Sequence, residues 1–242
     1  MTCFLLFIIG FFSSFLQGSI GFGAAVVMIN VIPFILPPSV TVVITQGACI
    51  IFPLCIVFRS WRKIRVDVLL PLLVPCLICT VLATRLSVGL DTSTMKLLLG
   101  ILFVLLALYF SFFADKISIK PTKKNAILAG TISGVLGGIF VAGGPPAVLY
   151  LAPALSDDRE EYVVTTQVYF IAMNTLSLLT RVLSKAVFSS DLPYMAYLTA
   201  GALCGVYAGT KAMKKVNGTL LKRFIYAFVG INGVVMILNE VL

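Results

Sequence analysis

Long apolar runs separated by short polar loops make up most of the chain. Six of these runs are long enough, or nearly long enough, to cross a bilayer: residues 40–58, 68–84, 97–113, 162–180, 192–210 and 224–239. As helices they would be about 24 to 29 Å long, compared with a hydrocarbon core of about 30 Å. The pattern therefore predicts six transmembrane helices.

Two further apolar regions are interrupted by helix breakers. Residues 3–36 contain QGSIGFG at positions 17–23, and residues 125–155 contain GGIFVAGGPPAVLYLAP at positions 137–153. As a single helix, each region would be about 47 to 51 Å long, which is too long for one crossing. Each is therefore predicted to form two short helical arms, of about 10 to 14 residues, that meet at the break.

The composition is that of an integral membrane protein. Of the 242 residues, 60% are hydrophobic and 11% are charged, which leaves too few polar side chains to cover a soluble domain. The predicted fold class is an all-α integral membrane protein in a lipid bilayer. Most of the net charge of +9 comes from short loops between apolar runs, so nucleic-acid binding is not expected.

Cysteine and histidine usage gives no sign of a metal site, a cofactor or histidine-based catalysis. The chain has six cysteines, all inside apolar runs, and no histidine. Cys76 and Cys79 have the spacing of a redox or metal motif, but no second such pair accompanies them. We interpret the cysteines as small buried apolar residues and expect no cofactor and no metal.

The two halves of the chain share four short matches in the same order. QGSIGFG corresponds to SGVLGGI at 133–139, VVITQ at 42–46 to VVTTQ at 163–167, Leu70-Pro71 to Leu192-Pro193, and Lys96 to Lys222. Ordered matches of this kind indicate an internal duplication. We therefore predict a first repeat at 1–113, a basic linker at 114–124 and a second repeat at 125–242. Each repeat would be a broken-helix hairpin followed by three transmembrane helices.

Basic residues are concentrated in three loops. Residues 59–65, 114–124 and 211–223 hold 13 of the 18 Lys and Arg residues, and the positive-inside rule places such loops in the cytoplasm. For all three to share one side, residues 125–155 must leave and return on that side as a hairpin. If residues 3–36 behave likewise, the repeats have inverted topology, as in many secondary transporters. The remaining loops would then be cytoplasmic at 156–161 and external at 85–96 and 181–191.

The breakers have a functional and a packing interpretation. Backbone groups freed at membrane depth are tolerated only where protein buries them or a watery cavity meets them. Glycine permits a sharp turn and the close approach of a ligand, and Pro145 and Pro146 can open a second arm whose N-terminus favours a small anion. Alternatively, glycines allow tight helix packing, which accounts for Gly130 better than for Gly143 and Gly144.

Polar side chains accompany the crossing that follows each hairpin. Gln46 and Gln167 occupy equivalent places in the two repeats, and a threonine precedes each. Their amide groups can donate to a sulfonyl or carboxylate oxygen, which favours a substrate site, and interhelical hydrogen bonding is the alternative. The asparagines are interpreted as packing contacts: Asn30, Asn174 and Asn232.

No charged side chain lies clearly in the middle of a predicted crossing. Arg181, for example, lies near the end of its run. A carboxylate proton relay is therefore not visible. A proton carried by the substrate and sodium coupling through carbonyl and hydroxyl oxygens both stay open.

The broken regions resemble the TauE/SafE family of sulfite exporters. The resemblance is carried by GSIGFGAAVVMINVIPFI in the first half and SGVLGGIFVAGGPPAVLYLA in the second, and it covers essentially the whole chain. It implies secondary transport of small sulfur-containing anions such as sulfite, thiosulfate or organosulfonates, in the plasma membrane of a prokaryote. Other small organic anions, such as carboxylates, are the alternative. With the breaks and the paired polar residues, the predicted substrate-binding residues are Gly21, Phe22, Gly23, Thr45, Gln46, Gly138, Gly143, Gly144, Pro145, Thr166 and Gln167.

Other function classes fit the pattern less well. A membrane-embedded enzyme would need a nucleophile, a base or a metal cluster, and the sequence offers none that stands out. A structural protein would not need paired broken hairpins with matching glutamines. An anion channel of the same architecture stays open beside the carrier, and so does a homodimer.

Overall fold

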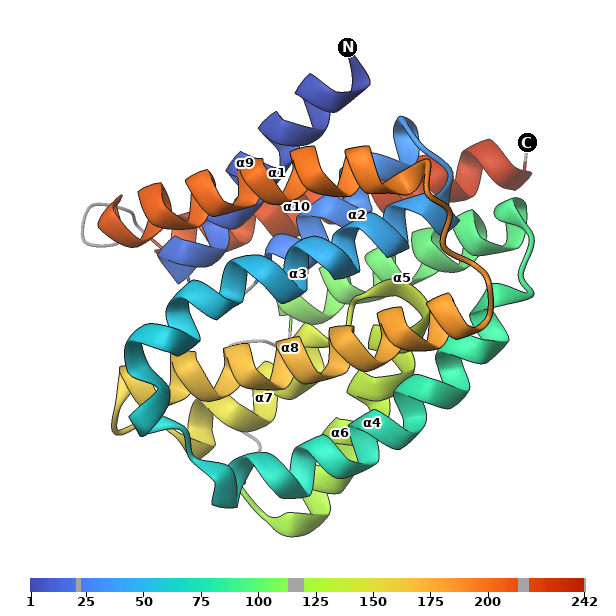
Figure 1. Cartoon of the computed structure of the whole chain (residues 1–242). Coiled ribbons are helices and arrows are strands. Elements are labelled where there is room, and N and C mark those ends of the chain that lie inside the picture. Colours follow the sequence, from blue (N-terminus) through green and yellow to red (C-terminus); the bar gives the residue numbers. More distant parts are fainter. Residues whose placement is uncertain (21–22, 113–119, 213–217, 242) are drawn as a thin grey trace.

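The computed structural model describes residues 1–20, 23–112, 120–212 and 218–241, and every element in these ranges is helical (Figure 1). The first half contains α1 (Thr2–Ile20), α2 (Ala24–Val31), the short turn η1 (Ile32–Phe34), α3 (Pro38–Ser60), the short turn η2 (Trp61–Lys63), α4 (Val66–Val88) and α5 (Thr92–Phe112). The second half contains α6 (Lys123–Phe140), α7 (Gly144–Ala154), α8 (Arg159–Leu183), α9 (Asp191–Ala212) and α10 (Gly218–Val241). The predicted all-α fold is therefore confirmed.

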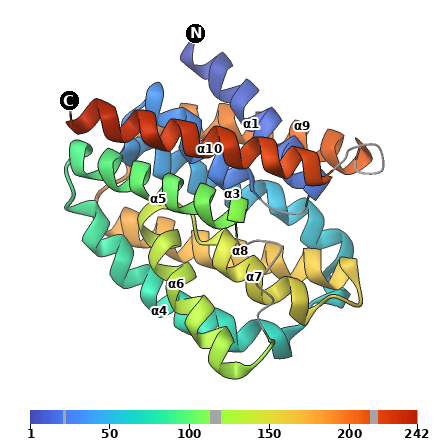
Figure 2. The ribbon, with the colours of Figure 1, turned by 180° about the vertical axis from the view of Figure 1, so that it is seen from behind.

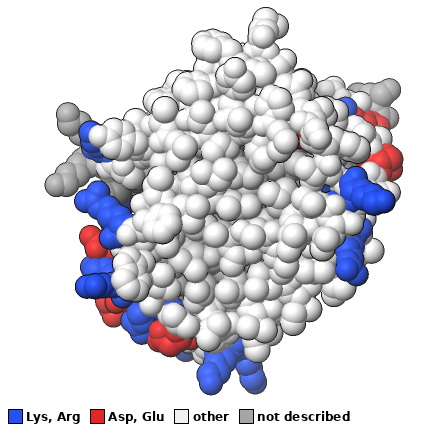
Figure 3. Space-filling model, viewed as in Figure 1, with Lys and Arg blue, Asp and Glu red and all other residues white. Residues whose placement is uncertain are grey.

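The long helices have the surface of a membrane protein. By length and composition, three helices in the described ranges could cross a membrane: Pro38–Lys63, Val66–Val88 and Arg159–Leu183. α4 exposes an apolar side chain at every fourth position, namely Leu70, Val74, Ile78, Leu82 and Leu86. Figure 3 shows a broad face without charged side chains, with the charges along its edges. Such a surface is suited to contact with lipid.

Each region predicted to be broken is a pair of helices with unequal arms. α1 and α6 have 19 and 18 residues, whereas α2 and α7 have 8 and 11. The expectation of arms of similar length is therefore wrong. The first arm is longer because it packs along a full-length neighbour, α9 for α1 and α4 for α6.

Helices pair across the two halves of the chain. The most extensive packing joins α1 with α9, α4 with α6, α5 with α10 and α3 with α8 (Figures 1 and 2). If each helix of the first half is exchanged for its counterpart in the second half, so that α1 becomes α6 and α9 becomes α4, the α1–α9 pair becomes the α6–α4 pair. Two buried apolar clusters follow the same exchange, one among α1, α2, α3 and α9 and the other among α6, α7, α8 and α4. An internal duplication would give this pairing, and the duplication itself stays a prediction.

Glycines let these pairs approach closely. A Cβ on Gly205 of α9 would overlap the carbonyl oxygen of Phe11 on α1, and one on Gly134 of α6 would overlap that of Cys76 on α4. A backbone carbonyl oxygen of the neighbouring helix also lies too close for a Cβ at three other glycines: Gly130, Gly201 and Gly209. The packing interpretation therefore applies to these glycines.

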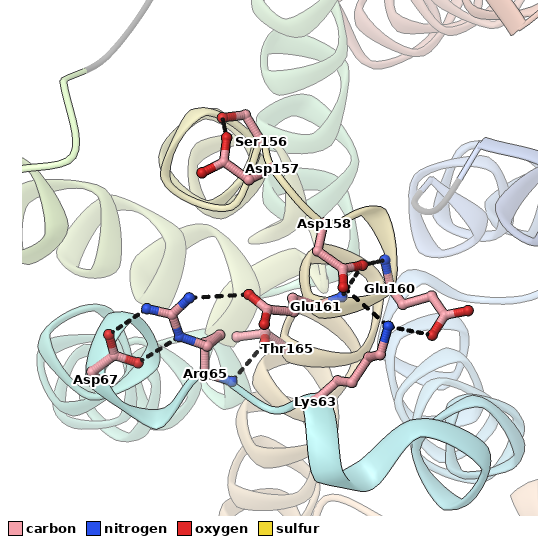
Figure 4. A network of polar contacts seen from close by, with 9 residues as sticks. All are labelled: Lys63, Arg65, Asp67, Ser156, Asp157, Asp158, Glu160, Glu161 and Thr165. Carbon is pink, nitrogen blue, oxygen red and sulfur yellow. Dashed lines mark hydrogen bonds and ion pairs between the residues drawn. The ribbon is translucent and has the colours of Figure 1, made fainter.

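Charged loops from both halves meet at one end of the helices. Lys63 in η2 pairs with Asp158 at 3.0 Å, and Arg65 pairs with Glu161 at 3.0 Å (Figure 4). These ion pairs join the loop between α3 and α4 to the start of α8. The positive-inside rule predicts that the basic α3–α4 loop lies in the cytoplasm, and the start of α8 lies at the same end.

The two hairpins start from opposite ends of the molecule. α6 runs parallel to α4, because Gly130 faces Leu72 and Gly138 faces Thr80, so both helices start at the end with the ion pairs. α8 starts at that end too and crosses to the other before α9 begins. α1 runs parallel to α9, so it starts at the end opposite to α6. Inverted topology predicts this arrangement.

Candidate functional site

The first break turns at a glycine in the left-handed conformation. Gly23 has a φ of 110° and precedes Ala24, the first residue of α2. Glycine adopts this angle without steric cost. The Oε1 atom of Gln17 on α1 accepts a hydrogen bond from the backbone N–H of Ala24 at 3.0 Å, which fixes the start of α2. Gly21 and Phe22, two predicted site residues, lie outside the described residues.

The second break turns at a valine. Val141 follows α6 with a φ of 60°, in a region where a β-branched residue is strained. The N–H groups of Val141 and Ala142 donate to the carbonyl oxygens of Gly137 and Leu136, at 3.0 and 3.2 Å, and close the end of α6. The expectation that glycine provides the sharp turn therefore holds for the first break and is wrong for the second.

Gly143 is required at the second break by close approach. Its φ of −70° suits any residue, but a Cβ would lie 2.5 Å from the carbonyl oxygen of Ser133 on α6. The hydroxyl of Ser133 donates to the carbonyl oxygen of Gly143, and Tyr169 on α8 donates to Ser133 at 2.6 Å. The tip of the hairpin is therefore held against α6 and α8.

A small cavity lies between the two breaks. Its wall includes Gln17 and Gly23 from the first break, Gly144 from the second, and Phe170 and Asn174 from α8. Its volume of about 30 Å³ leaves room for a water molecule or two. Gly23 and Gly144 are thus predicted site residues that the fold brings together.

The N-termini of two short helices meet at this cavity. Ala25 and Val26 in the first turn of α2 form part of its wall, as does Gly144, the first residue of α7. The first backbone bond of α2 runs from the N–H of Val27 to the carbonyl oxygen of Gly23, so the N–H groups before it have no partner within the helix. Two positive helix ends at one cavity favour a bound anion.

Two other predicted site residues, Pro145 and Gly138, shape the helices and do not line this cavity. Pro145 and Pro146 open α7 as expected, because a fixed φ suits the first turn and the missing N–H costs little. Gly138 lies on α6 against α4, where a Cβ would be 2.7 Å from the carbonyl oxygen of Thr80. Both positions therefore act on the geometry of the second break.

The two predicted glutamines are fully buried and lie outside the cavity wall. Gln167 accepts a hydrogen bond at its Oε1 from the Nε2 of Gln17, at 3.0 Å. Gln46 donates from its Nε2 to the hydroxyl of Ser177 on α8, at 2.6 Å. In this structure both glutamines make interhelical hydrogen bonds, as the packing alternative supposed.

Several buried oxygen atoms near these glutamines have no hydrogen-bond partner among the described residues. They include the hydroxyls of Thr45 and Thr166, the two predicted threonines, and the Oε1 of Gln46. A buried polar group without a partner is costly. These oxygen atoms therefore have unused capacity to accept hydrogen bonds.

Sequence reasoning missed two amides that line the cavity, Gln17 and Asn174. Asn174 donates from its Nδ2 to the carbonyl oxygen of Phe170 at 2.8 Å, while its Oδ1 has no partner among the described residues. Gln17 was visible as the first polar residue of the break, and Asn174 as the residue two helical turns after Gln167. The packing interpretation does hold for Asn232, which donates to Asn30 at 2.6 Å.

No group of three or more His, Cys, Asp or Glu side chains in the described ranges could hold a metal ion, and the six cysteines are free thiols. Ligand contacts at the cavity would come from backbone N–H groups and amides.

Comparison with known proteins gives one match. A sequence profile of the family described as sulfite exporter TauE/SafE matches residues 6–236, nearly the whole chain. No curated protein sequence and no solved structure matches it. The matched region contains both breaks and every helix that contributes to the cavity. The chain therefore belongs to the sulfite exporter TauE/SafE family and is a membrane anion transporter, not an enzyme.

Proposed function

We propose that this protein is a secondary transporter of small sulfur-containing anions, such as sulfite, thiosulfate or an organosulfonate, in the plasma membrane of a prokaryote. The proposal rests on one observation above all. The N-termini of α2 and α7, from opposite halves of the chain, contribute to the wall of one cavity. Broken helices that aim their N-termini at an anionic group are a recurring substrate site in secondary transporters.

The chemistry of the cavity suits a small oxyanion. The N–H groups of Ala25 and Val26 would be donors to the oxygen atoms of one anion. So would the second amide hydrogens of Gln17 and Asn174, which their bonds to Gln167 and Phe170 leave over. Apolar side chains, including Phe52 and Phe170, form the rest of the wall. They would exclude water and strengthen each of these interactions.

The small volume of the cavity supports a carrier in a closed state. A cavity of about 30 Å³ holds water and not a sulfonate, so the helices must separate before the substrate enters. Rocking of one repeat against the other would open the cavity to each side in turn. A channel would need a continuous path in one conformation.

A thermal-shift screen of the purified protein tests the substrate class. Sulfite, thiosulfate and methanesulfonate should raise the melting temperature in proportion to the logarithm of their concentration, because a ligand of the folded state stabilises it. Lactate at equal ionic strength controls for carboxylates. A shift with lactate and none with the sulfur oxyanions would contradict the proposed substrate.

Saturation and counterflow in proteoliposomes test the carrier mechanism. A carrier should show flux that saturates, and uptake of labelled substrate should accelerate when unlabelled substrate is inside. Flux that rises linearly without counterflow would identify a channel instead.

A further inference from the structure

A buried arginine of α8 lies against the C-terminal end of α6. Arg181 on α8 is only 2% exposed, and within the described residues no carboxylate lies at ion-pair distance from it. Arginine keeps its charge when buried. An uncompensated charge inside a membrane protein is expensive and is a functional-site hypothesis by default.

The contacts of Arg181 are to the end of α6. Its Nη2 donates to the carbonyl oxygen of Gly138 at 2.9 Å, to that of Ile139 at 3.3 Å, and to the hydroxyl of Ser87 on α4 at 2.9 Å. The last carbonyl groups of a helix have no partner within it, and at membrane depth they need one. Its Nε has no partner among the described residues.

The groups that hydrogen-bond Arg181 are neutral, and so are the groups bonded to them in turn. The hydroxyl of Thr84 donates to the same Gly138 carbonyl at 3.1 Å and lies 2.8 Å from the hydroxyl of Ser177. The amide of Gln46 completes this chain by donating to Ser177. The end of α6 carries only about half a negative charge, so the full charge of Arg181 exceeds it.

We infer that Arg181 sets the charge selectivity of the second break by making the tip of its hairpin electropositive. Val141, which lines the cavity, follows Ile139 by two residues, so the charge is held close to the cavity. The positive end of α7 adds to the same field. The inference rests on the proposed function, because it assigns Arg181 a role in preferring anions at that site.

The obvious competitor is a purely structural role, in which Arg181 only satisfies the carbonyl groups of α6. Two substitutions separate the roles. Arg181→Gln keeps hydrogen-bond donors and removes the charge, whereas Arg181→Lys keeps the charge with a simpler geometry. Ser87→Ala is the matched control, since it removes one contact of Arg181 and leaves the charge.

Calorimetric titration of sulfite into each purified variant is the first test. Arg181 lies about 10 Å along α8 from Asn174 at the cavity, at 1.5 Å per residue. Loss of a unit charge at that distance, with an effective dielectric constant of about 20, corresponds to affinity weakened on the order of tenfold. Arg181→Gln should show this loss, and Arg181→Lys and Ser87→Ala should stay within about threefold of the parent. Equal loss in the Gln variant and in Ser87→Ala, or none in the Gln variant, would overturn the inference. A parent that binds none of sulfite, thiosulfate and methanesulfonate would instead refute the proposed function.

A second test needs no change at Arg181, which keeps the inference falsifiable where Arg181→Gln does not fold. The thiol of Ala25→Cys, at the cavity, is reacted with an anionic and with a cationic methanethiosulfonate in protein whose native cysteines are replaced by alanine. After correction for the rates on a free thiol, the anionic reagent should react faster. Where Arg181→Gln folds, it should lower that ratio. A preference for the cationic reagent would overturn the inference even where sulfite binds.

Discussion

Gln17 on α1 donates from its Nε2 to the Oε1 of Gln167 on α8 at 3.0 Å, which links the first break to the second half of the chain. The Oε1 of the same Gln17 accepts from the N–H of Ala24 and so fixes the start of α2. One side chain therefore joins the first hairpin, the cavity wall and α8.

Gln17→Ala should weaken both folding and substrate binding. Removing the amide leaves the buried Oε1 of Gln167 and the N–H of Ala24 without this partner, a cost of about 1 to 3 kcal/mol per group. Calorimetry should show sulfite affinity reduced about tenfold or more. Asn232→Ala is the control, because it breaks an interhelical hydrogen bond between side-chain amides, to Asn30, and should leave sulfite affinity unchanged. Equal effects of both variants on affinity would argue against a role for Gln17 at the site.

Alanine substitution of the two adjacent glycines at the second break should change the stability of the protein to different extents. A Cβ on Gly144 would meet Phe170 at 3.5 Å, an ordinary contact, so Gly144→Ala should fold normally. A Cβ on Gly143 would lie 2.5 Å from the Ser133 carbonyl oxygen, so Gly143→Ala should destabilise by about 1 to 3 kcal/mol. Melting temperatures of the two variants in one detergent measure the difference.

Gly144→Leu should abolish transport in a folded protein. Its side chain would extend into a cavity of only about 30 Å³ that Gly144 lines. Size-exclusion profiles establish folding, and uptake of labelled substrate into proteoliposomes measures transport. Normal flux in this variant would mean that the cavity lies away from the pathway.

Gly130→Ala should be strongly destabilising, although alanine is the better helix former. The added Cβ would overlap the carbonyl oxygen of Leu72 and force α6 away from α4. Gly89→Ala is the control, since its Cβ would be 3.8 Å from the nearest atom, the carbonyl oxygen of Leu86. If the two variants melt at the same temperature, the close helix contact is not present in the folded protein.

The ion pair between Lys63 and Asp158 should make stability depend on pH under acidic conditions. The hydrogen bond from Lys63 lowers the pKa of Asp158 from its ordinary value of 3.8. The resulting stabilisation is present above that ordinary value and is lost as the pH falls below it through the lowered pKa. Asp158→Asn keeps a capping side chain for α8 and removes the charge. Its melting temperature should lie below that of the parent at pH 7, and the gap should close in acid.

Hydrophobic pattern and breakers were enough to predict the helices and both breaks. Charge placement was enough to predict that the second broken region is a hairpin, and the observed direction of α6 agrees. These features depend on local composition and on loop position, which the sequence displays directly.

The detailed contacts of the site were beyond sequence reasoning because they join distant segments. Gln46 and Gln167 occupy equivalent positions, yet one bonds Ser177 and the other Gln17, according to which neighbour packs against each. Val141 adopts a strained φ because the hydrogen bonds that close α6 impose it. Arg181 looked like a residue near a run end, and only the position of the broken α6 explains its burial.

Protection of a cavity thiol by substrate would show whether the anion binds between the two breaks. The claim is that the transported anion binds between the two breaks, where Ala25 lines the cavity. Labelling of Ala25→Cys is followed in transport-active protein without native cysteines, at increasing methanesulfonate, with lactate as the control. Labelling should slow with a half-effect at the KM of methanesulfonate transport, and lactate should have no effect. Saturable transport with an unchanged labelling rate at every methanesulfonate concentration would contradict it.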